Sequence, residues 1–230
     1  MPAYSHPDRL LLAVDCIIFG YHAGEVNLLI VRREVEPRRG ASALMGGFVF
    51  ARESVDAAAA RVTRELTGLQ DVYLEQFHAF GEVDRDEGDR IVSLGYYALV
   101  QQEAATRQLS DDYDAHWVPI TEVPPLVFDH NEMVEAALTR LRYRATHEPV
   151  AFRLLPEKFT LTQLQSLYES IFMQRIDPGN FRRRLRKMPY LVRQAEKDVS
   201  TSRKGAWYYR FDYGAFAEAQ EQGAEFLLKP

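Results

Sequence analysis

The segment from Asp177 to Met188, DPGNFRRRLRKM, combines an apolar stripe with a dense set of basic side chains. At helical spacing, Phe181, Leu185 and Met188 share one face, at positions i, i+4 and i+7. Five cations on one short helix repel each other, and phosphates would relieve that repulsion. Arginine and asparagine also match the edges of guanine and adenine in the major groove. The segment therefore predicts a helix that contacts DNA through Asn180, Arg182, Arg183, Arg184, Arg186 and Lys187; the alternative is a basic helix that only keeps the domain in solution.

The flanking sequence predicts the elements that would position this helix. Residues 160–173 have apolar side chains at helical spacing, with Thr160 as the N-cap. A short turn follows, and Asp177 as N-cap and Pro178 at the first helical position begin the basic helix. Two strands, residues 191–194 and 206–211, flank a polar, basic segment. Two helices joined by a tight turn and followed by a two-stranded wing form a winged helix-turn-helix, in which the wing would reach backbone phosphates through Lys197, Arg203 and Lys204.

The first half of the sequence alternates strands and helices. Residues 10–19 and 26–33 predict a hairpin, and residues 38–47 a glycine-punctuated loop. A helix is expected over 54–66, with Ser54 as its N-cap and Gly68 just beyond its end. Residues 72–80, 91–101 and 116–120 are strand candidates, and Asp129 is expected to cap a helix over 131–145. The pattern is typical of an α/β or α+β domain.

Composition and charge favour two folded domains. Hydrophobic residues make up 47% of the 230 residues, enough for a packed core. The net charge of −5 is unevenly distributed: residues 1–150 carry 14 Lys/Arg against 24 Asp/Glu, and residues 151–230 carry 14 against 9. This asymmetry suggests a polyanionic partner for the second half, although a solvated basic face would give the same balance. We place the domain boundary after residue 148, giving domains 1–148 and 149–230.

Several protein classes conflict with this composition. The sequence has no apolar run close to the roughly 20 residues of a membrane helix, and residues 1–9 lack the pattern of a signal peptide. The single cysteine, Cys16, excludes an internal disulfide framework and lies in an apolar run, where a small buried residue is expected. We therefore expect a cytoplasmic protein with no membrane partner.

Residues 46–53 and 61–69, GGFVFARE and RVTRELTGL, resemble the Nudix box, G-x5-E-x7-R-E-U-x-E-E-x-G-U, where U is aliphatic. The positions that match are Gly47, Glu53, Arg61, Glu65, Gly68 and Leu69. In a working Nudix enzyme, carboxylates on one face of this helix hold Mg²⁺ against a diphosphate. The pattern asks for three glutamates there, but this sequence has Val62, Glu65 and Leu66. Valine and leucine cannot bind a metal ion, so we expect no catalytic residues, no metal site and no cofactor, with Glu53 and Glu65 as the only remaining candidates for residual Mg²⁺ binding.

Two interpretations of Arg61 remain open at this point. It can form an i,i+4 surface pair with Glu65, worth about 0.3–0.5 kcal/mol. The resemblance instead implies that Arg61 braces the loop that carries Gly47, and we favour this interpretation because Gly47 and Glu53 stand at the matching spacing.

Over nearly its whole length the sequence resembles the Nudix-related transcriptional regulators, the NrtR-type repressors and their AraR-like relatives. The most specific segments are residues 154–161, LLPEKFTL, and 180–183, NFRR, because ordinary Nudix hydrolases lack such a C-terminal domain. The resemblance implies an N-terminal Nudix α/β/α sandwich, residues 1–148, and a C-terminal winged helix-turn-helix, residues 149–230. It also implies a homodimer on a palindromic double-stranded operator, with a small effector in the Nudix pocket.

The effector implied by the resemblance is ADP-ribose or a related nucleotide in one branch and a pentose in the other; Met45 and residues 128–130 look closer to the sugar branch. The candidate contacts surround the pocket that the box would form: Arg33, Gly47, Phe48, Arg61, Glu65, Glu75 and Arg90. Two alternatives to a ligand-responsive regulator remain. One is a true Nudix hydrolase of nucleoside diphosphate derivatives with a basic C-terminal domain, and the other is a sugar- or nucleotide-binding protein with no role on DNA.

Overall fold

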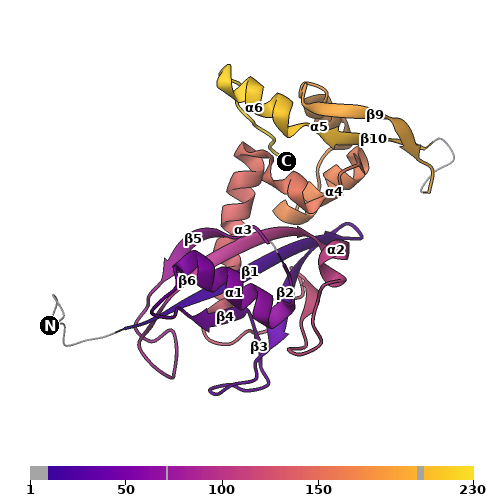
Figure 1. Cartoon of the computed structure of the whole chain (residues 1–230). Coiled ribbons are helices and arrows are strands. Elements are labelled where there is room, and N and C mark those ends of the chain that lie inside the picture. The colour runs from indigo at the N-terminus through magenta and orange to yellow at the C-terminus, as the bar shows by residue number, and fades with distance from the viewer. Residues whose placement is uncertain (1–9, 71, 201–204) are drawn as a thin grey trace. The chain divides into compact units, whose positions relative to one another are not determined.

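The computed structural model describes residues 10–70, 72–200 and 205–230, which fall into two compact units (Figure 1). Of these residues, the first unit contains those up to 18, 28–98 and 105–137, and the second contains 19–27, 99–104 and 138–230. Helix α3 (His130–His147) contributes to both units. The domain boundary after residue 148 stays a prediction.

A seven-stranded sheet forms the centre of the first unit. Its strands follow the order β3-β2-β1-β6-β5, with β4 paired to β1 and β7 paired to β2. The bounds are β1 (Leu11–His22), β2 (Glu25–Arg32), β3 (Ser42–Ala43), β4 (Met45–Phe48), β5 (Glu75–Phe80), β6 (Ile91–Gln101) and β7 (His116–Pro119). The apolar run of β1 is buried without interruption from Ala13, which is typical of a strand covered on both faces.

Helix α1 (Val55–Thr67) packs against β4. Both predicted ends are confirmed: the Ser54 side chain accepts a hydrogen bond from the Ala57 N–H, and Gly68 ends the helix in the left-handed region at φ 82°. Val62 is buried against the strand, and a Cβ at Gly47 would come within 2.6 Å of its Cγ2. Glycine is therefore needed at position 47 for α1 to approach the sheet this closely.

Some helices and strands differ from those predicted from the sequence, mainly where a strand pairs with a partner far away in the chain. Part of the segment expected as a loop forms β4, because Ala13 to Cys16 of β1 pair with Phe48 to Met45. The short helix α2 (Gln102–Thr106) was not expected, and β5 begins at Glu75 rather than at residue 72. Asp129 directly precedes α3 as predicted, but its carboxylate accepts hydrogen bonds from Arg85.

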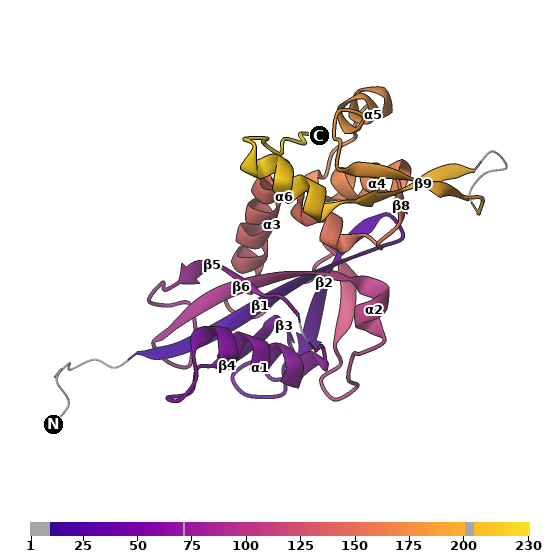
Figure 2. The same ribbon diagram turned by 45° about the horizontal axis from the view of Figure 1, so that its top comes forward.

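The second unit contains the expected winged helix-turn-helix elements (Figure 2). They are β8 (Phe159–Thr160), α4 (Leu161–Phe172), α5 (Pro178–Leu185), β9 (Leu191–Asp198) and β10 (Ala206–Phe211), with a three-stranded sheet in the order β8-β10-β9. Thr160 and Gln163 form a reciprocal capping box at the start of α4. The 3₁₀ helix η1 (Pro149–Leu154) and helix α6 (Tyr213–Glu221) were not predicted.

The interior of the second unit is aromatic. Phe181 and Leu185 of α5 are buried, as the apolar stripe predicted, and the Phe181 ring lies 5.6 Å from that of Tyr168 on α4. A further cluster joins η1, β10, α6 and the segment after α6 through Phe152, Tyr190, Phe211, Phe216 and Phe226. Among the residues that the structure describes, no helix has the length and apolar character needed to cross a membrane.

Candidate functional site

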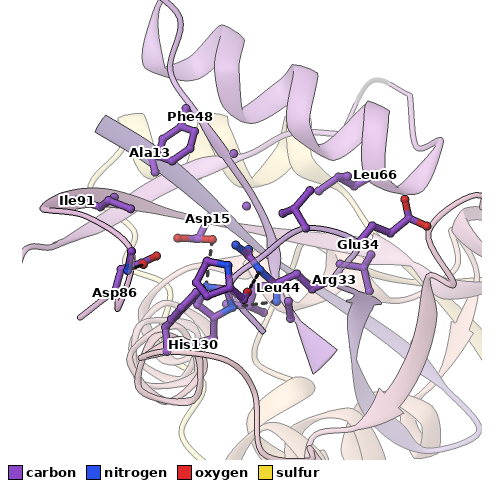
Figure 3. A pocket seen from close by; sticks show the side chains of 18 of the residues that line it. Ala13, Asp15, Arg33, Glu34, Leu44, Phe48, Leu66, Asp86, Ile91 and His130 are labelled. Carbon is purple, nitrogen blue, oxygen red and sulfur yellow. Dashed lines mark hydrogen bonds and ion pairs between the residues drawn. The ribbon is translucent and has the colours of Figure 1, made fainter. Parts of the chain in front are cut away.

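A cavity of about 610 Å³ opens in the first unit (Figure 3). Its wall is formed by β1, the end of β2 and the loop that follows, β4, the 85–91 segment and the start of α3. Such a volume suits a small organic ligand or a nucleotide. Three of the predicted ligand-binding residues, Arg33, Gly47 and Phe48, belong to this wall, and Leu66 belongs to it as well.

Asp15, Arg85 and His130 of the wall belong to a buried group of charged and polar side chains. Arg85 donates to both carboxylate oxygens of Asp129, at 2.8 and 2.7 Å, and its Nη2 lies 3.6 Å from Asp15 Oδ2. The Ser93 hydroxyl donates to the same oxygen of Asp15 at 2.6 Å. Asp15 is only 4% exposed, so these contacts supply the hydrogen bonds that a buried carboxylate needs.

His130, the first residue of α3, also belongs to this buried group. Its Nδ1 accepts a hydrogen bond from the Leu44 N–H at 3.1 Å, and its Nε2 lies 3.4 Å from Asp15 Oδ1 (Figure 3). An Nδ1 that accepts a hydrogen bond carries no proton, so the proton of the neutral ring is on Nε2, facing Asp15. Burial lowers the pKa of His130 below its ordinary value, and the nearby carboxylates of Asp15 and Asp129 oppose this shift.

Arg33, which follows β2, also belongs to the cavity wall. Its guanidinium carbon is 5.1 Å from the centroid of the Phe128 ring, and its Nε donates to the Pro37 carbonyl at 2.7 Å. A second nitrogen, Nη2, donates to the Glu36 carbonyl at 3.3 Å. The arginine thus holds the loop after β2 in place and presents its charge at the cavity.

The other four predicted ligand-binding residues lie outside this wall. Arg61 and Glu65 are on α1, and Glu75 on β5 accepts a hydrogen bond from the Tyr97 hydroxyl. Arg90 donates to the carbonyls of Gly81, Glu82 and Ile91, which makes it a brace for its own loop. A role for these four residues in ligand binding remains a prediction.

Arg61 connects the parts of the Nudix-like segment. It donates to both carboxylate oxygens of Glu53, at 3.0 and 2.7 Å, and to Glu65 at 3.1 Å. It also donates to the Phe48 carbonyl at 2.8 Å, next to Gly47. The surface pair and the loop brace that the sequence left as alternatives are therefore both present. The hydrogen bonds from Arg61 lower the pKa of Glu53, and those to Glu53 raise the pKa of Arg61.

The donor set on this face of α1 does not match a magnesium cluster. Val62 is buried against Gly47, Leu66 contributes an aliphatic chain to the cavity, and the carboxylates of Glu53 and Glu65 are bound to Arg61. Within residues 10–70, 72–200 and 205–230, His, Cys, Asp and Glu side chains form no group of three or more suited to a metal ion. Octahedral Mg²⁺ coordination needs several free oxygen ligands, and this face offers none that lacks an arginine partner.

The second unit presents the predicted basic helix, but α5 ends at Leu185, so Arg186 and Lys187 follow the helix instead of lying on it. The Asp177 side chain caps α5 by accepting from the Asn180 N–H at 2.8 Å. All six predicted contact residues are exposed: Asn180, Arg182, Arg183, Arg184, Arg186 and Lys187. Arg183 donates to the Asn180 side chain at 2.7 Å, so the two residues form one polar surface that can face base edges. Arg184 differs from the others because it donates to the backbone carbonyls of Lys229 and Pro230.

The sequence analysis missed two residues of the wing, Arg193 and Trp207. Trp207 on β10 lies opposite Lys197 on β9, whose Nζ is 4.5 Å from the centroid of the indole. The guanidinium carbon of Arg193, also on β9, is 4.8 Å from the same centroid. Strand β9 extends to Asp198, beyond the predicted strand of residues 191–194, and its alternation places residues 193 and 197 on one face. The early end of the predicted strand concealed this signal. The predicted contacts Arg203 and Lys204 lie outside the described residues.

Family models match two parts of the chain. Residues 9–137 match the NUDIX domain, and residues 151–211 match the NrtR DNA-binding winged helix domain. Together these two segments contain the cavity wall, helix α5 and the described residues of the wing.

Two similar proteins match most of this chain, and an isolated domain matches 60% of it. The "ADPR responsive transcriptional repressor NtrR" of Acinetobacter baylyi is 31% identical over 205 residues, which is 87% of this chain and 82% of the relative. The crystal structure of Shewanella oneidensis NrtR complexed with a 27mer DNA is 30% identical with a TM-score of 0.78, over 94% of this chain and 98% of that one. The NUDIX domain of the same protein, crystallised with ADP ribose, is 33% identical with a TM-score of 0.54, over 60% of this chain and 95% of that one.

Proposed function

The chain belongs to the family of Nudix-related transcriptional regulators with an NrtR winged helix, and from this we propose that it is a repressor that binds ADP-ribose in the cavity of its first unit. Binding of ADP-ribose changes its affinity for operator DNA. The observation that carries the proposal is the presence in one chain of a 610 Å³ cavity and an exposed basic recognition helix.

Helix α5 supplies the DNA contact. Its buried stripe of Phe181 and Leu185 fixes the helix on the domain and leaves Asn180, Arg183 and Lys187 outward. Arginine and asparagine read guanine and adenine edges, while lysine neutralises phosphate. We further propose that two copies bind a palindromic operator, because two-fold symmetry of a dimer places two such helices on matching half-sites.

The choice of ADP-ribose over a pentose rests on two supports. The Acinetobacter relative is described as ADPR responsive, and the Shewanella NUDIX domain was crystallised with ADP ribose. The cavity itself has the volume of a nucleotide site, and Arg33 and Phe128 supply a cation and an aromatic ring at its wall. Neither support requires the ligand to be cleaved.

The same proposal holds that the cavity binds its ligand without cleaving it. A Nudix reaction needs Mg²⁺ to neutralise the diphosphate and activate water. Of the three carboxylate positions on α1 only Glu65 remains, and its carboxylate accepts a hydrogen bond from Arg61. An enzyme that lost its metal ligands but kept its fold retains the binding cavity as a sensor.

The test uses the full chain and an operator selected by it from random double-stranded DNA. Adding ADP-ribose in EDTA should change operator affinity by about 5- to 150-fold, the usual range for allosteric coupling, and should raise the melting temperature of the protein. Arabinose and AMP are the comparison ligands. If arabinose acts and ADP-ribose does not, the effector assignment is wrong, and if the chain selects no DNA, the regulatory assignment itself fails.

A parallel assay addresses catalysis. ADP-ribose is incubated with the protein and Mg²⁺ or Mn²⁺, and AMP release is followed. We expect turnover far below the ~10 s⁻¹ of a typical enzyme. Turnover near that value would establish the hydrolase alternative instead.

A further inference from the structure

The segment that follows α6 is anchored in the second unit. Phe226 is 4% exposed and its ring lies 6.0 Å from that of Phe216, and the Leu228 side chain is completely buried. The Leu228 N–H donates to the Thr146 carbonyl, near the end of α3, at 2.9 Å. This segment lies beyond residues 151–211, the part of the chain that matches the winged helix domain. Two buried side chains and a backbone hydrogen bond therefore fix a stretch with no helix or strand of its own.

The same segment ends on the recognition helix (Figure 2). The Arg184 Nη1 donates to the Pro230 carbonyl at 3.0 Å and also to the Lys229 carbonyl. Residues 226–230 thus connect the end of α3, at Thr146, with the last turn of α5, at Arg184.

The position of Arg184 on the helix agrees with these contacts. At about 100° per residue, Arg183 points almost directly away from the buried stripe of Phe181 and Leu185. Arg184 lies only about 80° from the centre of that stripe, on the flank of α5. A side chain on the flank reaches the body of the domain more readily than the centre of a DNA groove.

We propose that residues 226–230 form a strap that fixes the orientation of α5, and that Arg184 anchors this strap rather than contacting DNA. The proposal rests on the DNA-binding function and reassigns one of the six residues predicted to contact DNA. Arg184 acts as a positioning residue: through Lys229 and Pro230 it limits how far α5 can roll, so that Asn180 and Arg183 face the groove.

Salt dependence of operator binding separates the two roles. Each phosphate contact that is lost lowers the slope of log K against log salt by about 0.9. Arg184→Met should weaken operator binding and leave this slope unchanged. Lys187→Met, at the exposed lysine assigned to phosphate, is the control, and it should lower the slope by about one. A reduction of about one in the slope for Arg184→Met would overturn the proposal.

Amide hydrogen exchange in the protein without DNA gives a rate that the loss of a DNA contact cannot change. Loss of the Arg184 hydrogen bonds should speed exchange of the Leu228 amide by about 2- to 10-fold, the effect of one or two modest hydrogen bonds on a local opening. Arg183→Met, on the outward face of α5, is the matched control and should not change the exchange rate of the Leu228 amide. An unchanged Leu228 exchange rate in Arg184→Met would also overturn the strap. This measurement remains decisive if the chain binds no DNA, so the two failures are distinguishable.

A double-mutant cycle completes the test. Leu228→Ala loosens the strap at its buried end, while Leu227→Ala alters the neighbouring leucine, which is 52% exposed. Leu228→Ala combined with Arg184→Met should weaken operator binding little more than either single change, because both act on one strap. Leu227→Ala should have no effect. Additive effects of Leu228→Ala and Arg184→Met would show that the two residues act separately; if Leu228→Ala does not fold, the two Arg184→Met measurements decide.

Discussion

Arg85 of the cavity wall and Asp129 form a two-point ion pair, with nitrogen–oxygen distances of 2.8 and 2.7 Å. The side chain of Arg85 is 3% exposed and that of Asp129 is 14% exposed. The pair connects the loop before β6 to the start of α3, and Asp15 lies within 3.6 Å of the same guanidinium. One buried cation therefore balances two carboxylates, and we expect the stability of the cavity wall to depend on Arg85.

Arg85→Met should destabilise the first unit strongly. Removing one partner of a buried ion pair leaves an uncompensated charge and typically costs about 3–5 kcal/mol. Urea unfolding at pH 7 measures the loss. Arg38→Met is the control, because the Arg38–Glu87 pair is exposed on both sides and should contribute little. Equal stability of the two variants would show that the Arg85 contacts do not hold the wall together.

His130 should make stability fall between pH 7.5 and 5.5. Burial lowers the pKa of His130 below 6.5 in the folded protein. The positive charges of Arg85 and Arg33 also lower this pKa, whereas the carboxylates of Asp15 and Asp129 raise it. The unfolded chain then takes up a proton near pH 6.5 before the folded state does, so stability is full above that pH and is lost as the pH falls below it.

His130→Asn tests this dependence, since an asparagine oxygen can accept the hydrogen bond from the Leu44 N–H. Urea unfolding at pH 7.5, 6.5 and 5.5 should show a flatter pH profile for the variant than for the parent. The same change at His22, whose side chain is 53% exposed, controls for the loss of a histidine. Parallel profiles for His130→Asn and the parent would exclude His130 as the source.

Local signals in the sequence were sufficient to predict the helix ends. The side chains of Ser54, Thr160 and Asp177 each accept a hydrogen bond from a backbone N–H three residues later, and the positive φ of Gly68 ends α1. These contacts form within a few residues and depend little on the rest of the fold. The recognition helix was predicted for the same reason, because its apolar stripe and its cap lie within one short segment.

The cavity wall could not be predicted in this way. Asp15 meets Ser93 across 78 residues, and Arg85 meets Asp129 across 44. No local period connects such positions; the placement of β1 beside β6 brings Asp15 to Ser93, and the contact between Arg85 and Asp129 joins a loop to the residue before α3. The strap at residues 226–230 was missed for a similar reason: its contacts are with Thr146 and Arg184, far away in the sequence. A carboxylate inside the apolar run of β1 was the one available indication of a buried polar group.

Glu53 should support stability at neutral pH and lose this role in acid. The hydrogen bonds from Arg61 lower its pKa below the ordinary 4.5, so the folded state holds the proton less tightly than the unfolded chain. The contribution is therefore full above about pH 4.5 and is lost as the pH falls through the lower folded value. Glu53→Gln should be less stable than the parent at pH 7, and the difference should shrink by pH 4. A difference that stays constant from pH 7 to pH 4 in urea unfolding would contradict the assignment.

Trp207 should hold the two wing cations, Arg193 and Lys197, against the DNA backbone. A cation over an exposed indole gains about 0.5–1 kcal/mol, so losing the ring should weaken operator binding by about 2- to 5-fold for each cation that is released. Trp207→Leu removes the π face, and Trp207→Phe keeps part of it and should show a smaller loss. The measurement is operator affinity by fluorescence anisotropy at several salt concentrations.

Neutralising Arg193 distinguishes a wing that contacts DNA through its cations from one in which the cation–indole contacts only stabilise the hairpin. Arg193→Gln should lower the slope of log K against log salt by about one, because one phosphate contact is lost. Trp207→Leu should change the slope less than Arg193→Gln does, since both cations keep their charge and lose only their fixed position. Arg107→Gln, at an exposed arginine of the first unit, should leave the slope unchanged. If Arg193→Gln behaves like Arg107→Gln, the Trp207 face of the wing does not meet DNA, and the cation–indole contacts serve only to stabilise the hairpin.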